Sequence, residues 1–410
     1  MSRSIQPNDG LTGLRPVVTP PPFGVMPNAA HQDALGFMKA DTFALAVVEF
    51  DDQGRCYDRA QLDTVSDRVE TMRTGREDVI LLLFVHGWKH DARSDDPNLS
   101  SFRVVLAQTA AYERSSAAAA GGAPRPVMGI FVGWRGLTAY GPSDIVADTT
   151  FWGRQAAGHR VAVGSVRELF GRLRHYRNSR LKNGGAPLLV IAGHSFGGMI
   201  VYSALAQSLI ESASAPVETV IPAFADLVVL ANPAIEGARY LPIYDLVSST
   251  AFKGRTNVQL PVFVCVQATN DQPVGTFFPI GNFANRLEEA TIGGLEERCV
   301  THAIGFIDEF RTHKIAGPDG NAPFVLTPPQ IEQADPFWVV AAAKAVIDGH
   351  SGIWQAPFLS FLKALVFQQV ARSQATTIAA ASLNDAIVAR TEKAPGTGGN
   401  LADFAKEIGL

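Results

Sequence analysis

Short, continuous apolar runs alternate along this chain with longer segments that have helical spacing. The run 79–85 (VILLLFV) has the composition of a strand buried on both faces of a parallel sheet. In 60–74, apolar residues recur every three or four positions, as on one face of a helix. The same patterns predict strands at 43–50, 79–85, 127–133, 187–192, 226–231, 258–268 and 337–343, and helices at 60–74, 99–115, 150–182, 197–212 and 355–390. This alternation predicts an α/β fold, a mostly parallel sheet flanked by helices.

The connections between these elements suggest one main domain with two insertions. Segments 136–185 and 276–335 are long compared with typical connections in a parallel sheet, so cap-like insertions over a site are expected there. The α/β domain is expected to cover 41–390. The Pro-rich segment 1–40 is predicted to be a flexible lead, and 391–410 a loose tail.

Composition narrows the class of protein. Among 410 residues, 47% are hydrophobic and 18% charged, which suits a sizeable globular core. A net charge of −4 argues against a nucleic-acid partner. Cys56, Cys265 and Cys299 are too widely spaced to indicate a disulfide framework or a zinc site. With no secretory leader pattern and no apolar run of about eighteen residues, a cytoplasmic protein without a transmembrane segment is expected, its oligomeric state open.

The segment Gly193-His194-Ser195-Phe196-Gly197 carries the clearest chemical signal. It lies between an apolar β-branched run and an apolar helical stretch, and it matches G-x-S-x-G. A serine at such a sharp strand-to-helix turn is held in a strained conformation with its hydroxyl exposed for reaction. Flanking glycines allow strand and helix to approach closely. The pattern is short enough to arise by chance, but its position between a strand and a helix favours Ser195 as a nucleophile.

The G-H-S-F-G-G turn and the His86-Gly87-Trp88 segment after strand 79–85 together resemble the α/β-hydrolase superfamily. Within it, the chain is similar to bacterial serine esterases and lipases, over about residues 43–370. The resemblance implies hydrolysis of a small-molecule or lipid carboxylic ester, with no metal or organic cofactor. The same machinery would serve a thioesterase, amidase or acyltransferase, and a non-catalytic binding module could retain the fold.

The resemblance also implies the chain order nucleophile, acid, histidine. Asp271, just after strand 258–268, is the expected acid, and Glu236, after the preceding strand, is the alternative. His350 lies between glycines after the last predicted strand and is the expected general base. His302 is the next choice, whereas His313 is expected at the surface.

An oxyanion hole is implied at the backbone amides of Phe196 and Trp88, because the residue after the nucleophile and the loop after strand 79–85 supply these donors. His86 is then expected to shape the loop. A metal site at His86, His90, Asp91 and Asp95 is disfavoured, since no ligand spacing rule is met. At the end of strand 127–133, Trp134 and Arg135 are open to two readings, a substrate pocket or structural packing.

Overall fold

The computed structural model describes residues 17–18, 43–72, 78–93, 96–135, 151–277 and 293–372. Most of the predicted lead 1–40, all of the tail 391–410, and the parts 136–150 and 278–292 of the two predicted insertions lie outside these ranges. So does the end of the last predicted helix, beyond residue 372.

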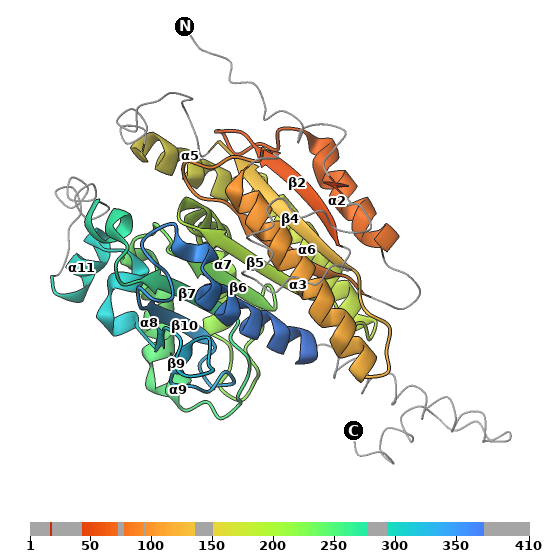
Figure 1. Ribbon diagram of the computed structural model, residues 1–410. Helices are drawn as coiled ribbons and strands as arrows, with labels where there is room; N and C mark the ends of the chain where they lie inside the picture. Colours follow the sequence, from red (N-terminus) through yellow and green to blue (C-terminus); the bar gives the residue numbers. More distant parts are fainter. Residues whose placement is uncertain are drawn as a thin grey trace, which may run out of the picture.

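A ten-stranded sheet runs through the molecule (Figure 1). The order is β1-β2-β4-β3-β5-β6-β7-β10-β8-β9. Pairing is parallel from β2 through to β8, and antiparallel at the two edges, β1 with β2 and β8 with β9. The strands are β1 Val17–Val18, β2 Ala44–Phe50, β3 Ile80–Val85, β4 Val127–Trp134, β5 Leu188–His194, β6 Leu227–Ala231, β7 Phe263–Ala268, β8 His313–Ala316, β9 Val325–Thr327 and β10 Phe337–Ala342. The predicted α/β fold class, a mostly parallel sheet flanked by helices, is confirmed.

Helices cover both faces of the sheet (Figure 1). They are α2 Arg59–Met72, α3 Pro97–Ala119, α5 Phe151–Val163, α6 Val166–Lys182, α7 Phe196–Ala213, α8 Leu241–Ser248, α9 Thr250–Lys253, α11 Leu295–Thr301 and the helical residues 356–372. Short 3₁₀ segments lie at Gly237–Arg239, Ile304–Phe306, Asp308–Phe310 and Gly352–Trp354, and a π-helical turn at Pro273–Phe277.

Alternate residues of the buried strands pack into two hydrophobic cores, one on each face of the sheet. Along β3, Leu81 and Leu83 pack with α2 and with α5 to α8, whereas Leu82 and Phe84 pack with α3 and residues 356–372. Side chains on a strand point alternately to its two faces, so a wholly apolar strand needs a helical layer on each side. The continuous apolar runs in the sequence reflect this arrangement.

The start of α3 is fixed by its cap. The helix was expected from 99 but begins at Pro97, because the Asp96 side chain accepts hydrogen bonds from the N–H groups of Asn98 (2.8 Å) and Leu99 (3.4 Å). Proline is favourable at the first helical position, where no intrahelical N–H bond is lost. The Asp-Pro pair is therefore a helix start as well as the end of a loop.

The predicted insertions contain elements that join the sheet and its helical layers. The described part of 136–185 forms α5 and α6, whose buried side chains belong to the core beneath α7. Within 276–335, β8 and β9 extend the sheet beyond β10. The sequence patterns missed these two strands, which have only four and three residues and alternate between buried and exposed positions. Among the described helices, none has the length and apolarity needed to cross a membrane.

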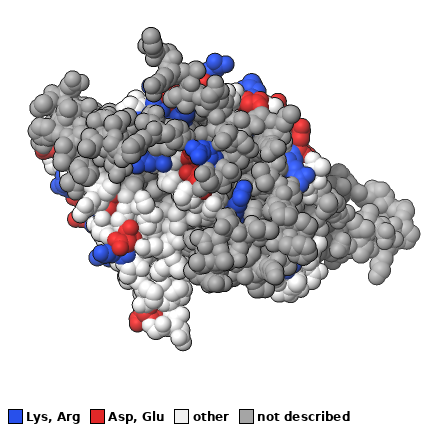
Figure 2. All heavy atoms as spheres, turned by 45° about the horizontal axis from the view of Figure 1, so that its top comes forward, with Lys and Arg blue, Asp and Glu red and all other residues white. Residues whose placement is uncertain are grey.

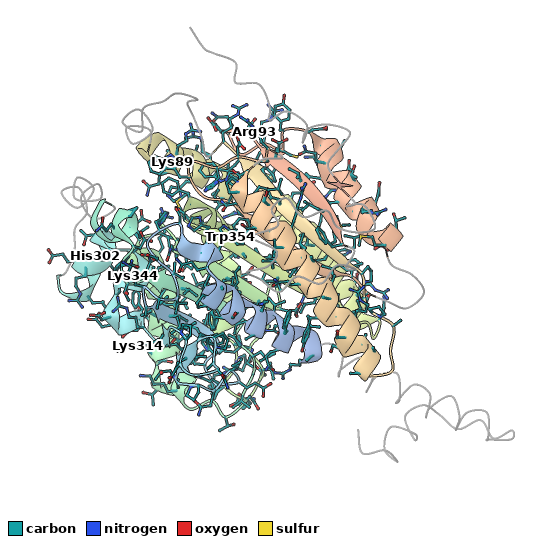
Figure 3. The ribbon with its side chains drawn as sticks, viewed as in Figure 1. Lys89, Arg93, His302, Lys314, Lys344 and Trp354 are labelled. Atoms are coloured by element: carbon teal, nitrogen blue, oxygen red, sulfur yellow. The ribbon has the colours of Figure 1, made fainter. Side chains whose placement is uncertain are left out.

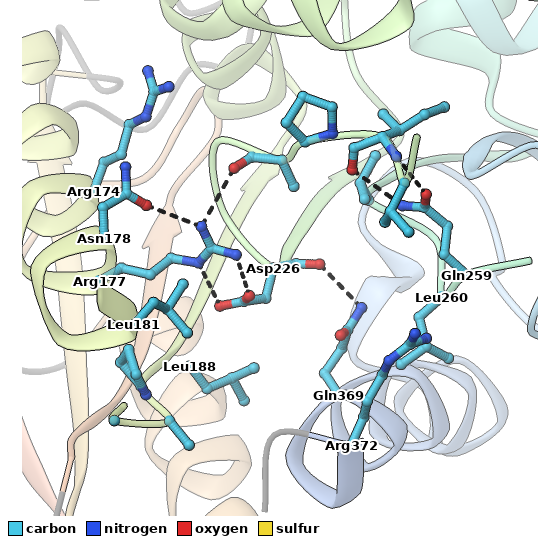
Figure 4. Close-up of a pocket in the computed structure, with 18 residues that line it drawn as sticks. Arg174, Arg177, Asn178, Leu181, Leu188, Asp226, Gln259, Leu260, Gln369 and Arg372 are labelled. Atoms are coloured by element: carbon cyan, nitrogen blue, oxygen red, sulfur yellow. Dashed lines mark hydrogen bonds and ion pairs between the residues drawn. The ribbon is translucent and has the colours of Figure 1, made fainter. Parts of the chain in front are cut away.

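A pocket at the amino-terminal ends of β5 and β6 shows how α6 is tied to the sheet (Figure 4). Arg177 on α6 forms a two-bond ion pair with Asp226, at 2.9 and 2.5 Å. Asp226 also accepts the N–H of Leu189 at 2.8 Å, and its main-chain oxygen accepts a bond from Gln369 at 3.0 Å. These bonds join helix and sheet at the edge opposite to the carboxyl end of β5.

On the face shown in Figure 2, basic and acidic side chains of the described residues are intermixed.

One ion pair is buried at the meeting point of several elements. The Arg125 guanidinium donates to both carboxylate oxygens of Glu113 at 2.9 Å, and the two side chains are only 7% and 1% exposed. Arg125 also donates to the main-chain oxygens of Ala186 (2.7 Å) and Val370 (3.3 Å). The pair therefore connects α3 to the segments just before β4 and β5 and to the helical residues 356–372.

We expect Glu113→Ala to lower the free energy of unfolding by about 3–5 kcal/mol, because it leaves the guanidinium buried without its counter-charge. Urea unfolding measures this loss. The matched control is Glu332→Ala, which removes an ion pair with Arg372 whose side chains are 53% and 47% exposed. That change should cost about 0–1 kcal/mol. Equal losses in the two variants would contradict the prediction.

Candidate active site

Ser195 occupies the sharp turn between β5 and α7. Its φ of 56° lies in the left-handed region that residues with a side chain rarely adopt. A Cβ on Gly197 would lie 2.1 Å from the carbonyl oxygen of Val85, and one on Gly193 would lie 2.5 Å from that of Gly197. Both positions therefore need glycine for packing, as the motif implied. The turn holds Ser195 at the carboxyl-terminal edge of the sheet.

His350 comes to Ser195 from the loop after β10. Its Nε2 lies 2.7 Å from Ser195 Oγ, and its Nδ1 lies 2.8 Å from Asp271 Oδ2. Because a carboxylate can only accept, Nδ1 carries the proton and Nε2 is free to accept the serine O–H. The hydrogen bonds thus run from Ser195 through His350 to Asp271.

Asp271 is held just after β7, with its carboxylate fully buried. Besides His350, Oδ2 accepts a bond from Gln267 Nε2 at 2.8 Å, and Oδ1 accepts the N–H of Val274 at 3.1 Å. These donors give both oxygens of the buried side chain a hydrogen-bond partner. The carboxylate is therefore fixed in the orientation that meets the imidazole.

The alternative acid and base have partners of their own. Glu236 forms an ion pair with Arg239 at 2.8 Å and accepts a bond from Gln155 at 3.3 Å. His302 follows α11 (Figure 3), where its Nδ1 lies 2.8 Å from the hydroxyl of the adjacent Thr301. The contacts to Ser195 and Asp271 come from His350 instead.

The expected surface position of His313 is wrong. The residue is 3% exposed on β8, its ring stacks on Trp338 at 4.0 Å, and its Nε2 lies 2.8 Å from Gln333 Nε2. Burial lowers the pKa of His313 to about 4. The side chain faces inward because it lies at a buried position of a strand that the sequence pattern had not revealed.

The loop after β3 lies directly against Ser195. A Cβ on Gly87 would lie 2.9 Å from the Cβ of Ser195, so only glycine fits this approach. Trp88 follows, and its ring centroid lies 6.4 Å from that of Phe196, the first residue of α7. The two residues expected to supply oxyanion donors thus lie on the segments that flank Ser195.

His86 connects this loop to the end of β4 through hydrogen bonds. Its Nε2 accepts the N–H of Trp134 at 3.1 Å, its Nδ1–H donates to Gly87 O at 2.9 Å, and Trp134 Nε1–H donates to His86 O at 2.8 Å. Complete burial lowers the pKa of His86 to about 4, so the ring is neutral. Trp134 is 2% exposed and stacks on His86, so it serves packing of the loop instead of lining a pocket.

Residues weighed as metal ligands have structural contacts. His90 Nδ1 lies 3.0 Å from Asp96 Oδ2, and Asp91 Oδ1 accepts the N–H of Arg93 at 3.0 Å. Asp95 lies outside the described residues. Elsewhere in the described ranges too, no group of three or more His, Cys, Asp and Glu side chains is arranged to hold a metal ion.

Three further side chains contact Asp271 or the main chain of His350: Asn232, Gln267 and His194. None was a candidate from sequence. Asn232 follows β6 with a φ of 46°, a conformation for which asparagine is enriched among non-glycine residues. His194 lies within the serine motif and Gln267 is a polar residue in an apolar strand, but neither position shows in the sequence which groups its side chain will contact.

No family model and no curated protein matches this chain. Among solved structures, TT1662 from Thermus thermophilus is similar at 14% identity over 72% of this chain and 90% of that one, with a TM-score of 0.29. Phospholipase PlaB from Legionella pneumophila, in complex with thio-NAD, is similar at 12% identity over 72% of this chain and 61% of that one, with a TM-score of 0.31. Trichoderma reesei cutinase, in complex with a phosphonate inhibitor, is similar at 16% identity over 59% and 83% of the chains, with a TM-score of 0.18. These scores are too low to transfer a family or an activity, so function must come from the geometry of the site.

Proposed function

We propose that this protein is a serine hydrolase of the α/β-hydrolase type, which cleaves carboxylic esters through an acyl-enzyme on Ser195. The observation that carries the proposal is the continuous chain of hydrogen bonds from Ser195 Oγ (2.7 Å) through His350 to Asp271 (2.8 Å). A nucleophile bonded to a base that is oriented by a third group is the arrangement that activates serine for acyl transfer. The strained turn at Ser195 supports the same assignment.

The proposed reaction begins when Ser195 Oγ attacks the ester carbonyl carbon and His350 Nε2 takes its proton. Asp271 keeps the imidazole in the tautomer that accepts this proton, and its charge stabilises the imidazolium. The main-chain N–H groups of Phe196 and Trp88 donate to the oxyanion of the tetrahedral intermediate. The alcohol then leaves with the proton from His350. Water, activated by the same ring, hydrolyses the acyl-enzyme and regenerates Ser195.

A chain-length series of nitrophenyl esters, from acetate to palmitate, tests the proposal on the wild-type protein. We expect turnover of at least one ester, and covalent labelling of one serine by a fluorophosphonate, because an activated hydroxyl attacks both kinds of electrophile. Matched thioesters and anilides compare the leaving groups, and the ester is expected to react at least about 100-fold faster than the anilide, whose amine is a poorer leaving group.

The possible results separate the candidate functions. A higher kcat/KM for thioesters than for esters would assign a thioesterase, and efficient anilide cleavage an amidase. Product formed only with an added alcohol would indicate an acyltransferase. No turnover and no label would contradict a hydrolase and favour a binding module that retains the fold.

A further inference from the structure

The side chain of Asn232 connects the ends of two strands to the loop that carries His350. Asn232 is fully buried just after β6. Its Oδ1 accepts the N–H of Ala268, at the end of β7, at 2.8 Å. Its Nδ2 donates to the main-chain oxygens of His350 at 2.8 Å and Gly349 at 3.1 Å. The oxygen thus faces an N–H donor and the nitrogen faces two carbonyl acceptors. These partners fix which end of the amide is oxygen and which is nitrogen.

His194 reaches the same carbonyl group from the strand of the nucleophile. Its Nε2–H donates to His350 O at 2.9 Å, and the two ring centroids are 5.0 Å apart. The other ring nitrogen, Nδ1, is buried without a hydrogen-bond partner. Because the ring is in the core, it is neutral with its proton on Nε2, and burial lowers the pKa of His194 well below its usual value.

We propose that Asn232 and His194 are positioning residues for the general base, and that they act by holding the main-chain carbonyl of His350 between two donors. This inference rests on the proposed function, since it concerns the same triad. Neither side chain contacts the Ser195 hydroxyl or the His350 ring nitrogens through the bonds described, so each acts through His350 and not on the substrate.

The loop that carries His350 contains glycines, so its main chain needs to be held by contacts from outside the loop. His350 follows Gly349, whose φ is 68°, and lies two residues before Gly352. Glycine leaves a backbone with more conformations than any other residue. A catalytic group misplaced by about 1 Å can lose about 100-fold in rate, so a base on this loop needs its main chain fixed by other contacts.

The two donors also connect the base to the other members of the triad. His194 is the residue before Ser195, and Asn232 binds Ala268, three residues before Asp271. The position of His350 is thereby set relative to the strand of the nucleophile and the strand of the acid. The carbonyl of His350 is the point at which both connections meet.

His194→Phe and Asn232→Gly remove the two donors with little change in the backbone. Phenylalanine keeps an aromatic ring and removes the unpartnered Nδ1, but its ring is larger than imidazole in a buried site, so a stability loss of about 1–3 kcal/mol is expected with the fold retained. Glycine retains the positive φ of position 232. We expect each change to lower kcat for a short nitrophenyl ester by about 10–100-fold, with KM changed less than about twofold, because the base is displaced while substrate contacts remain. Thermal unfolding checks the fold.

The matched control is Asn257→Gly, since Asn257 Nδ2 also donates to a main-chain oxygen, that of Glu218 at 2.7 Å, but away from the triad. This variant should keep wild-type kcat. His194→Gln offers a donor at the end of a flexible chain and should recover part of the activity lost in His194→Phe. In the double variant, the loss should differ from the product of the single losses, because both donors share one acceptor.

Wild-type activity with an unchanged kcat in folded His194→Phe and Asn232→Gly would overturn this inference and leave the proposed function standing. Equal losses of kcat in Asn257→Gly would also overturn it. If Asn232→Gly does not fold, comparison of His194→Phe with His194→Gln still tests the inference. Failure of glutamine to restore activity would then count against a positioning role for His194. A wild-type protein without turnover on any ester would overturn the proposed function and this inference with it.

Discussion

Replacing Ser195 with alanine is expected to abolish ester turnover, lowering kcat by about 10⁶-fold. The hydroxyl is the group that would form the acyl-enzyme, and alanine removes both this nucleophile and its 2.7 Å contact with His350 Nε2. Alanine keeps the Cβ, so backbone strain at the turn is unchanged and the fold should persist. The measurement is kcat on the best nitrophenyl ester, together with fluorophosphonate labelling followed by mass spectrometry.

The matched control for this change is Ser203→Ala. Ser203 lies on α7, two helical turns after Ser195, and its buried hydroxyl has no hydrogen-bond partner. That variant should label and turn over at rates within about twofold of wild type, as is usual for a residue outside the reacting unit. A label that persists in Ser195→Ala would contradict the assignment of the nucleophile.

Replacing His350 with alanine should have an effect of similar size, about 10⁶-fold on kcat, because serine and its base act as one unit. Without the imidazole, no group accepts the serine proton, and Asp271 has no ring to orient. The change removes a side chain that is 19% exposed, so the fold is expected to tolerate it. The same ester assay measures the loss, and near-ultraviolet circular dichroism checks tertiary packing.

His302→Ala is the informative comparison, since His302 is the other histidine considered for the base. Its ring binds the end of its own helix and the adjacent Thr301, so kcat should stay within about twofold of wild type. Loss of turnover in His302→Ala with activity retained in His350→Ala would reverse the assignment of the base.

Elements with strong local patterns could be predicted from the sequence. The continuous apolar runs of β3 and β5 and the helical spacing of α2 are properties of neighbouring residues, so the predicted and observed elements coincide closely. The short edge strands β8 and β9 had no comparable signal. Such strands are stabilised by pairing with β10 and with each other, which a linear pattern does not contain.

The same distinction applies to the candidate site. Ser195 could be singled out because strand, turn and helix are contiguous in the chain. Asp271 and His350 were expected from chain order within a resembling family, and their approach depends on contacts across 79 and 155 residues. Asn232 and His194 could not be found in this way, because what distinguishes them is a shared bond to one carbonyl oxygen on a distant loop.

The sequence by itself thus determined the sheet class and the serine turn, since apolar periodicity and glycine placement act over a few residues. Tertiary structure decided which loops meet. Parallel strands end at one edge, so residues that follow β3, β5, β6, β7 and β10 gather around Ser195 although they are dispersed along the chain. Their hydrogen bonds depend on the pairing of strands that are far apart in the sequence, which a pattern of neighbouring residues does not encode.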